Sequence, residues 1–211
     1  MMFASRADAG QRLGKLLRDE GTEADLVLGL PRGGVVVAAE VARVLERPLD
    51  VLVVRKIGHP WSREFAVGAM AEPDVVILDD ESLARNPVNR ARLDAIIEEE
   101  TQRLRDYRAR FHRCAPPDLA NKALLLVDDG LATGATMEAA VLAARKQIAQ
   151  IVIVAVPVAS VSALERLSRV ADAVKALNVD EDFQAVGQYY REFSQTSDEE
   201  VIALLEALAR P

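Results

Sequence analysis

Residues 124–137 decide the fold of this chain, and they read LLLVDDGLATGATM. A continuous apolar run ends in two adjacent acids, Asp128 and Asp129, and mostly small residues follow until a helical pattern begins near Thr136. Continuous apolar runs are typical of strands that are buried on both faces of a parallel sheet. Because ligands bind beyond the carboxyl ends of such strands, the two acids are predicted to face a ligand.

Similar strand-like runs alternate with helical patterns along the rest of the chain. This alternation predicts an α/β fold with a mainly parallel twisted sheet flanked by helices. Residues 1–211 are expected to form a single domain with a core at about 24–178, a helix at 7–20 and a C-terminal appendage at 179–211. The pattern at 91–112 predicts one long amphipathic helix that packs on the sheet.

Composition excludes several classes of protein. The net charge of −7 argues against a general binder of nucleic acid or of anionic membranes, since either usually needs a basic face. The single cysteine, Cys114, excludes an internal disulfide framework. The first ten residues lack a secretory signal, and the longest apolar run is too short to span a membrane. A cytoplasmic protein is therefore expected.

The residues after the two acids are suited to hold a phosphate. In GLATGAT, residues 130–136, the side chains are small enough for backbone N–H groups to surround an anion at the start of a helix. Carboxylates beside such a cradle suit a sugar phosphate, whose hydroxyls donate to the acids. The P-loop and GxGxxG patterns are absent. A plain Asp-Asp-Gly turn would explain the acids but not the whole pattern.

Together these residues resemble the phosphoribosyl pyrophosphate (PRPP) signature of the type I phosphoribosyltransferases, and most of all that of uncharacterised bacterial phosphoribosyltransferase-like proteins. The resemblance implies that the two acids hold the ribose hydroxyls and that the loop binds the 5′-phosphate. It also implies a small hood, here formed by terminal segments, that holds the acceptor. The residues implied for ribose and 5′-phosphate are Asp128, Asp129, Gly130, Ala132, Thr133, Gly134, Ala135 and Thr136.

Two further stretches resemble parts of the same family. GLPRGG, residues 29–34, stands where the family has its pyrophosphate loop, although alone it could be a plain turn. VVRKIGHPWSREF, residues 53–65, stands where the family has a mobile loop, so a loop at 56–65 is expected to close over the site. The residues implied for pyrophosphate are Arg32, Gly33, Gly34, Arg55 and Lys56.

The function predicted from this resemblance is transfer of the 5-phosphoribosyl group from PRPP to an unidentified acceptor, a nitrogenous base being favoured, with release of pyrophosphate. Asp129, Asp128, Lys56 and Arg55 are the predicted catalytic residues. Mg²⁺ is the expected cofactor, bound by the two acids directly or through water. The expected partners are small molecules, without nucleic acid or membrane, and the oligomeric state stays open, a homodimer included.

Alternatives remain at this level. A non-catalytic PRPP sensor would keep the same cradle, whereas a nucleic-acid-binding regulator would need a basic surface that the acidic total does not suggest. The aromatic residues within 183–195 could stack on an acceptor or simply pack. Arg6 and Asp8 could cap the N-terminal helix.

Overall fold

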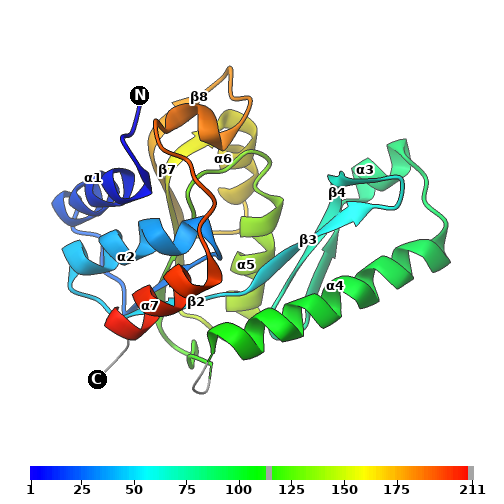
Figure 1. Cartoon of the computed structure of the whole chain (residues 1–211), viewed down its shortest axis with the longest axis horizontal. Helices are drawn as coiled ribbons and strands as arrows, with labels where there is room; N and C mark the ends of the chain where they lie inside the picture. The colour runs from blue at the N-terminus through cyan, green and yellow to red at the C-terminus, as the bar shows by residue number, and fades with distance from the viewer. Residues whose placement is uncertain (113–115, 209–211) are drawn as a thin grey trace.

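The computed structural model describes residues 1–112 and 116–208; Cys114 lies outside them. Its centre is a five-stranded sheet in the order β2-β1-β6-β7-β8, in which every neighbouring pair is parallel (Figure 1). The predicted α/β class is confirmed. The strands of this sheet are β1 (Leu26–Gly29), β2 (Leu49–Val51), β6 (Ala123–Val127), β7 (Ile151–Ser160) and β8 (Ala173–Asp180).

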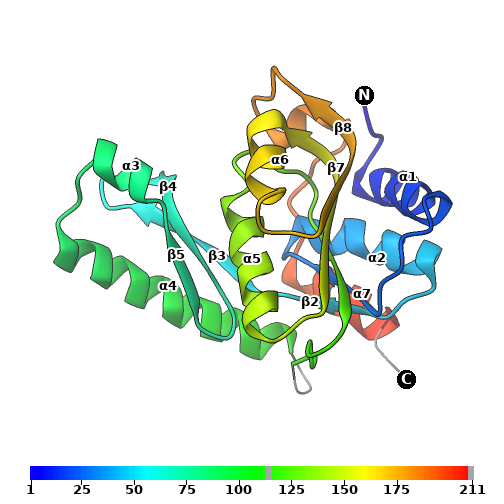
Figure 2. The ribbon, with the colours of Figure 1, turned by 180° about the vertical axis from the view of Figure 1, so that it is seen from behind.

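Helices cover both faces of this sheet (Figures 1 and 2). Alternate strand residues point to opposite faces, so Leu125 packs with one set of helices while Leu124 and Leu126 pack with the other. All three side chains are fully buried, which explains why the strand reads as a continuous apolar run. One face carries α1 (Arg6–Asp19), α2 (Gly33–Leu45) and α7 (Asp198–Leu208), and the other carries α5 (Ala135–Lys146) and α6 (Val161–Leu167).

A second, three-stranded antiparallel sheet extends from the body as an arm (Figures 1 and 2). The expected loop at 56–65 is wrong, because these residues form two paired strands joined at a tight turn. The long helix was also expected on the parallel sheet, but it packs on β3 of the arm. An apolar stripe indicates that one face of a helix is buried, but it does not indicate which sheet buries that face. The arm consists of β3 (Val54–His59), β4 (Ser62–Ala71), β5 (Val75–Leu78), α3 (Asp80–Arg85) and α4 (Arg90–Phe111).

The two terminal segments meet beside the end of β7. Phe3 N donates to the carbonyl oxygen of Tyr189 at 2.8 Å, and Arg191 N donates to that of Phe3 at 2.9 Å. The short helix η1 (Val186–Tyr189) precedes this pairing. We call residues 1–6 and 186–194 the hood, and their pairing gives the predicted terminal cap. Among the described residues, no helix has both the length and the apolar character needed to cross a bilayer.

The central position of β6 predicts a large effect of truncating Leu125, whose side chain is fully buried. We expect Leu125→Ala to lower the free energy of unfolding by about 2–5 kcal/mol, because the lost methyl groups leave a cavity. Denaturant titration would measure this loss. Ile151→Ala, at the 40% exposed first residue of β7, is the control and should cost well under half as much. Equal losses would contradict the central placement of β6.

Candidate functional site

The site lies where β1 and β6 end side by side. Gly29 is opposite Val127 in the sheet, and Leu30 N donates to the carbonyl oxygen of Val127 at 3.0 Å. The loop after β1 leads into α2 and the loop after β6 leads into α5. The structure therefore brings GLPRGG and DDGLATGAT together at one edge of the sheet, where open α/β sheets bind ligands.

The helices that follow these two loops begin without a capping side chain. Arg32 stands before α2 and Gly134 before α5, and neither makes a side-chain hydrogen bond to its helix. In α5, Ala135 N makes only a long bond of 3.5 Å to Thr133 Oγ1, and in α2, Val35 N donates to the carbonyl oxygen of Arg32 at 3.1 Å. The remaining N–H groups of each first turn can bind another acceptor, and the helix dipole favours an anion there. In contrast, α1, α3, α4 and α6 are each capped by a side chain, from Ser5, Asp79, Asn89 and Ser160.

The loop before α5 is held in place by the end of β7. Leu131 N donates to the carbonyl oxygen of Val158 at 2.9 Å, and Ser160 Oγ donates to that of Ala132 at 2.6 Å. Gly134 has a φ of 74°, which glycine adopts without strain. Ala132 and Thr133 are exposed. The loop therefore has a fixed backbone with an open outer side, and Ser160 is an anchor that the sequence did not reveal.

Both acids lean over the first two residues of α2, Gly33 and Gly34. A Cβ atom on Gly34 would lie 2.7 Å from Asp128 Oδ1 and 3.0 Å from the carbonyl oxygen of Val127. A Cβ atom on Gly33 would overlap Asp129 Oδ2. Only glycine leaves room for the two carboxylates here, so GLPRGG is more than a plain turn.

The environment of the two carboxylates disfavours their negative charges. Burial, and then the charge of Asp129, raises the pKa of Asp128 well above its usual range. Burial also raises the pKa of Asp129, against the hydrogen bond and charge of Arg6. The Lys56 ammonium lowers both pKa values. Ligand groups that donate hydrogen bonds or carry positive charge would therefore be favoured beside this pair.

The same pair can offer carboxylate oxygens to a divalent cation. No group of three or more His, Cys, Asp or Glu side chains within residues 1–112 and 116–208 could hold a metal by itself. Mg²⁺ commonly takes one or two carboxylates and completes its shell with water and substrate phosphate oxygens. Asp128 and Asp129 fit an ion that arrives with a phosphorylated ligand.

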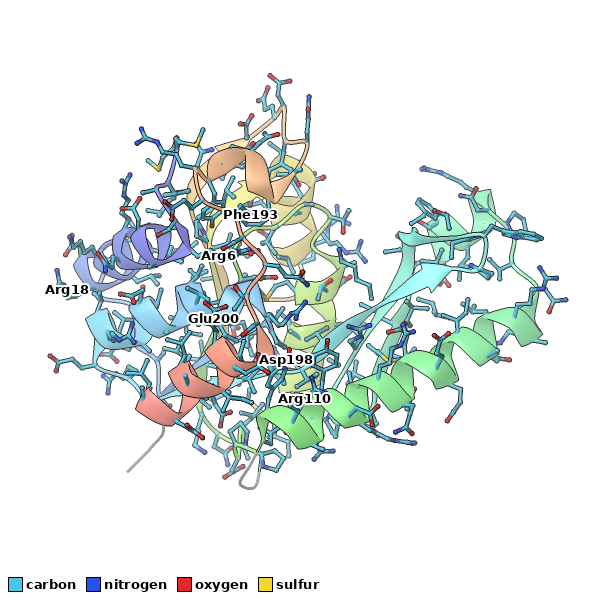
Figure 3. All side chains as sticks on the ribbon, in the orientation of Figure 1. Arg6, Arg18, Arg110, Phe193, Asp198 and Glu200 are labelled. Carbon is cyan, nitrogen blue, oxygen red and sulfur yellow. The ribbon has the colours of Figure 1, made fainter. Side chains whose placement is uncertain are left out.

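Arg6 is a member of the site that the sequence did not indicate. Its Nε donates to Asp129 Oδ2 at 2.7 Å, and its guanidinium lies 3.9 Å from the ring centroid of Phe193 (Figure 3). The expectation that Arg6 caps the helix is wrong, because Ser5 is the cap. The hood also reaches the backbone here, where Tyr190 Oη donates to the carbonyl oxygen of Asp129 at 2.6 Å. These contacts join residues far apart in sequence, so no local pattern marks them.

Lys56 and Thr136 line a cleft of about 520 Å³ between the arm and the body. Lys56 is exposed, while the neighbouring Arg55 turns toward α4. Arg55 donates from Nε at 3.0 Å and from Nη2 at 2.9 Å to Glu100 Oε2. The cleft is thus charged, and buried Glu100 holds one of the two predicted basic residues of β3 at its wall.

Arg32 lies at an adjoining cleft of about 270 Å³, which Arg55 also lines. Its Nη1 is 3.6 Å from Asp198 Oδ1 at the start of α7. Asp198 also pairs with Arg110 of α4 (Figure 3). Arg32, which the resemblance assigns to pyrophosphate, thus lines this cleft with an acid of the C-terminal helix beside it.

Comparison with known protein families assigns this chain to one of them. The model of the phosphoribosyl transferase domain matches residues 4–193. The chain belongs to this family. The match begins within the first segment of the hood and ends at Phe193, so it includes every predicted site residue. It does not test what each of those residues does.

Relatives agree with the family. A Mycobacterium tuberculosis (strain H37Rv) protein, provisionally described as a phosphoribosyl transferase, is 43% identical over 99% of this chain and 47% of its own length. The chain thus spans about half the length of the curated relatives it matches. The crystal structure of TT1426 from Thermus thermophilus is 44% identical, with a TM-score of 0.83 over 100% of both chains.

A more distant protein shows the fold alone. A hypothetical protein from Neisseria gonorrhoeae, solved with bound ppGpp, is 17% identical with a TM-score of 0.51, over 98% of this chain and 96% of that one. Members of this fold therefore differ widely in sequence around the same sheet.

Substitution by alanine is predicted to have different effects at Gly33 and Gly34. We expect Gly34→Ala to destabilise the protein by about 1–3 kcal/mol, because the new methyl group meets backbone atoms that cannot move easily. Gly33→Ala should cost less, since its methyl group meets only the side-chain ends of Asp129 and Arg6. Denaturant midpoints would rank the two variants, and a crystal structure of Gly33→Ala should show Asp129 displaced. The reverse ranking would contradict the geometry described.

Proposed function

We propose that this domain transfers the 5-phosphoribosyl group from PRPP to a small-molecule acceptor and releases pyrophosphate. The observation that carries the proposal is the placement of two adjacent carboxylates between two helix starts that lack capping side chains. PRPP offers what such a site accepts, namely a ribose diol between two phosphorylated ends. Membership of the phosphoribosyl transferase family supports the same assignment.

In this proposal the parts of PRPP divide between the two loops. Asp128 and Asp129 accept hydrogen bonds from the ribose hydroxyls. The start of α5 binds the 5′-phosphate, with hydroxyl donors from Thr133 and Thr136. The start of α2, together with Arg32, binds the pyrophosphate. The alternative order, with the pyrophosphate at α5, would place the larger charge away from Arg32.

The reaction breaks the bond between C1′ and pyrophosphate and forms a bond between C1′ and the acceptor, whose displaced proton passes to a base or to water. Because positive charge grows on the ribose while negative charge grows on the leaving group, the site acts by positioning and by electrostatic stabilisation. Lys56 faces the departing charge across the cleft. Bound Mg²⁺ would neutralise part of the phosphate charge beside Asp128 and Asp129.

One observation favours a PRPP sensor as the second candidate. Arg32 and Arg55 lie beside Asp198 and Glu100, and these acids reduce the positive charge available to a departing pyrophosphate. A sensor needs only to bind PRPP in its ground state. An enzyme must also stabilise the charge that develops when the bond breaks.

The ribose assignment predicts a loss of PRPP affinity when either acid is neutralised. We expect Asp128→Asn and Asp129→Asn each to weaken Mg-PRPP binding by about 1.5–3 kcal/mol, because a charged acceptor becomes an amide. Calorimetry would measure the affinities. Asp74→Asn, in the turn between β4 and β5 where Asp74 pairs with Lys146 near the C-terminal end of α5, is the control and should keep wild-type binding. Unchanged affinity in both site variants would remove the ribose assignment.

A transferase and a sensor differ in how they respond to Lys56→Ala. Pyrophosphate release from PRPP should first be screened with purine, pyrimidine and pyridine acceptors. With an active acceptor, we expect Lys56→Ala to lower kcat by about 10²–10³, far more than it lowers PRPP affinity. Lys146→Ala, at the other end of α5, should behave as wild type. If PRPP binds but no acceptor yields pyrophosphate, the sensor is supported.

A further inference from the structure

Every polar contact recorded for the Arg6 side chain lies within the site or the hood. Besides the Nε bond to Asp129 Oδ2, Nη1 donates to the carbonyl oxygen of Ser194 at 2.7 Å. The guanidinium face covers the ring of Phe193. The Arg6 side chain is only 12% exposed and that of Asp129 only 15%. Such an ion pair has little competition from water, and three contacts fix the guanidinium in one orientation.

The Arg6–Asp129 pair lies directly on the start of α2. A Cβ atom on Gly33 would lie 2.7 Å from Arg6 Nε as well as overlapping the Asp129 carboxylate. The pair therefore stands between the two loops that we assign to pyrophosphate and ribose. A carboxylate at a strand end has two side-chain torsions to fix, and here the hood supplies the group that fixes them.

Aromatic rings of the hood pack together beside this pair. The Tyr190 ring packs at 5.1 Å from that of Phe193 and at 5.5 Å from that of Phe3. Phe193 contacts Arg6 and packs against Tyr190, so it contributes to the packing of the hood. It is still 39% exposed, so both roles stay open for the aromatic residues of 183–195.

We propose that Arg6 is a positioning residue that orients the Asp129 carboxylate toward the ribose and thereby couples the hood to the sugar site. The inference rests on the proposed function. Arg6 acts through Asp129 and does not itself contact PRPP in this account. Removing Arg6 should therefore weaken PRPP binding only as long as Asp129 is present to be oriented.

Arg12 provides a matched control on the same helix. It also pairs with an aspartate, Asp8, at 2.9 Å, and its guanidinium also lies over an aromatic ring, that of Phe3, at 5.7 Å. It differs from Arg6 because its partner is not a site residue. A general effect of losing a cation from α1 would appear equally in both variants.

The experiment is a double-mutant cycle on the Kd of Mg-PRPP, measured by calorimetry with ligand up to the millimolar range. We expect Arg6→Gln to raise Kd about tenfold in the wild-type background and less than about threefold in the Asp129→Asn background. Arg6→Lys should recover part of the loss, because the ammonium can pair with Asp129 but has no second nitrogen to reach Ser194 as the guanidinium does. Arg12→Gln should stay within about twofold of wild type.

Each outcome decides the inference. Equal losses from Arg6→Gln in both backgrounds, or an equal loss from Arg12→Gln, would overturn it and leave Arg6 with a structural role. If Arg6→Gln does not fold, Arg6→Lys carries the same cycle and the same criterion. If the wild type does not bind Mg-PRPP, the proposed function fails and the inference fails with it. If the wild type binds Mg-PRPP but the losses from Arg6→Gln and Asp129→Asn are additive, the inference about Arg6 fails while the proposed function stands.

Discussion

The contact between two carboxylates and two glycines is the constraint on which the site depends. Asp128 and Asp129 occupy the volume that side chains at Gly34 and Gly33 would fill. This contact requires β1 and β6 to be adjacent and parallel, so that the loops that follow both strands begin at the same edge of the sheet. It also explains the burial that raises the pKa of both acids. The rest of the sheet serves to hold these ends together.

The sequence predicted those parts of this arrangement that depend on residues close together along the chain. Apolar runs marked the strands of the parallel sheet because alternate residues are buried on both faces. The two loop motifs marked the site because acids and small residues follow buried strands. The fold class and the family are confirmed. The single-domain organisation, the roles of the site residues, Mg²⁺ and a homodimer stay predictions.

The missing parts depend on contacts between distant residues. Arg6 meets Asp129 across 123 positions and Arg55 meets Glu100 across 45, and no motif connects them. The hairpin at 56–65 was missed for another reason. Its β3–β4 hairpin contains Gly58, Pro60 and charged residues, a composition that reads as a loop, and pairing between the two strands overrides it. Helix α4 was found from its apolar stripe, but its neighbour was not.

The hood joins the first residues of the chain to a segment near its other end, since Phe3 pairs with Tyr190 and Arg6 with Ser194. Contacts of such long sequence separation form slowly, because the chain loses the entropy of closing the intervening loop before the contacts can stabilise it. The parallel sheet and its two loops can assemble before this closure. Until the two ends of the chain meet, the Asp129 carboxylate lacks the Arg6 guanidinium that pairs with it, so the sugar site is complete only when this closure has formed.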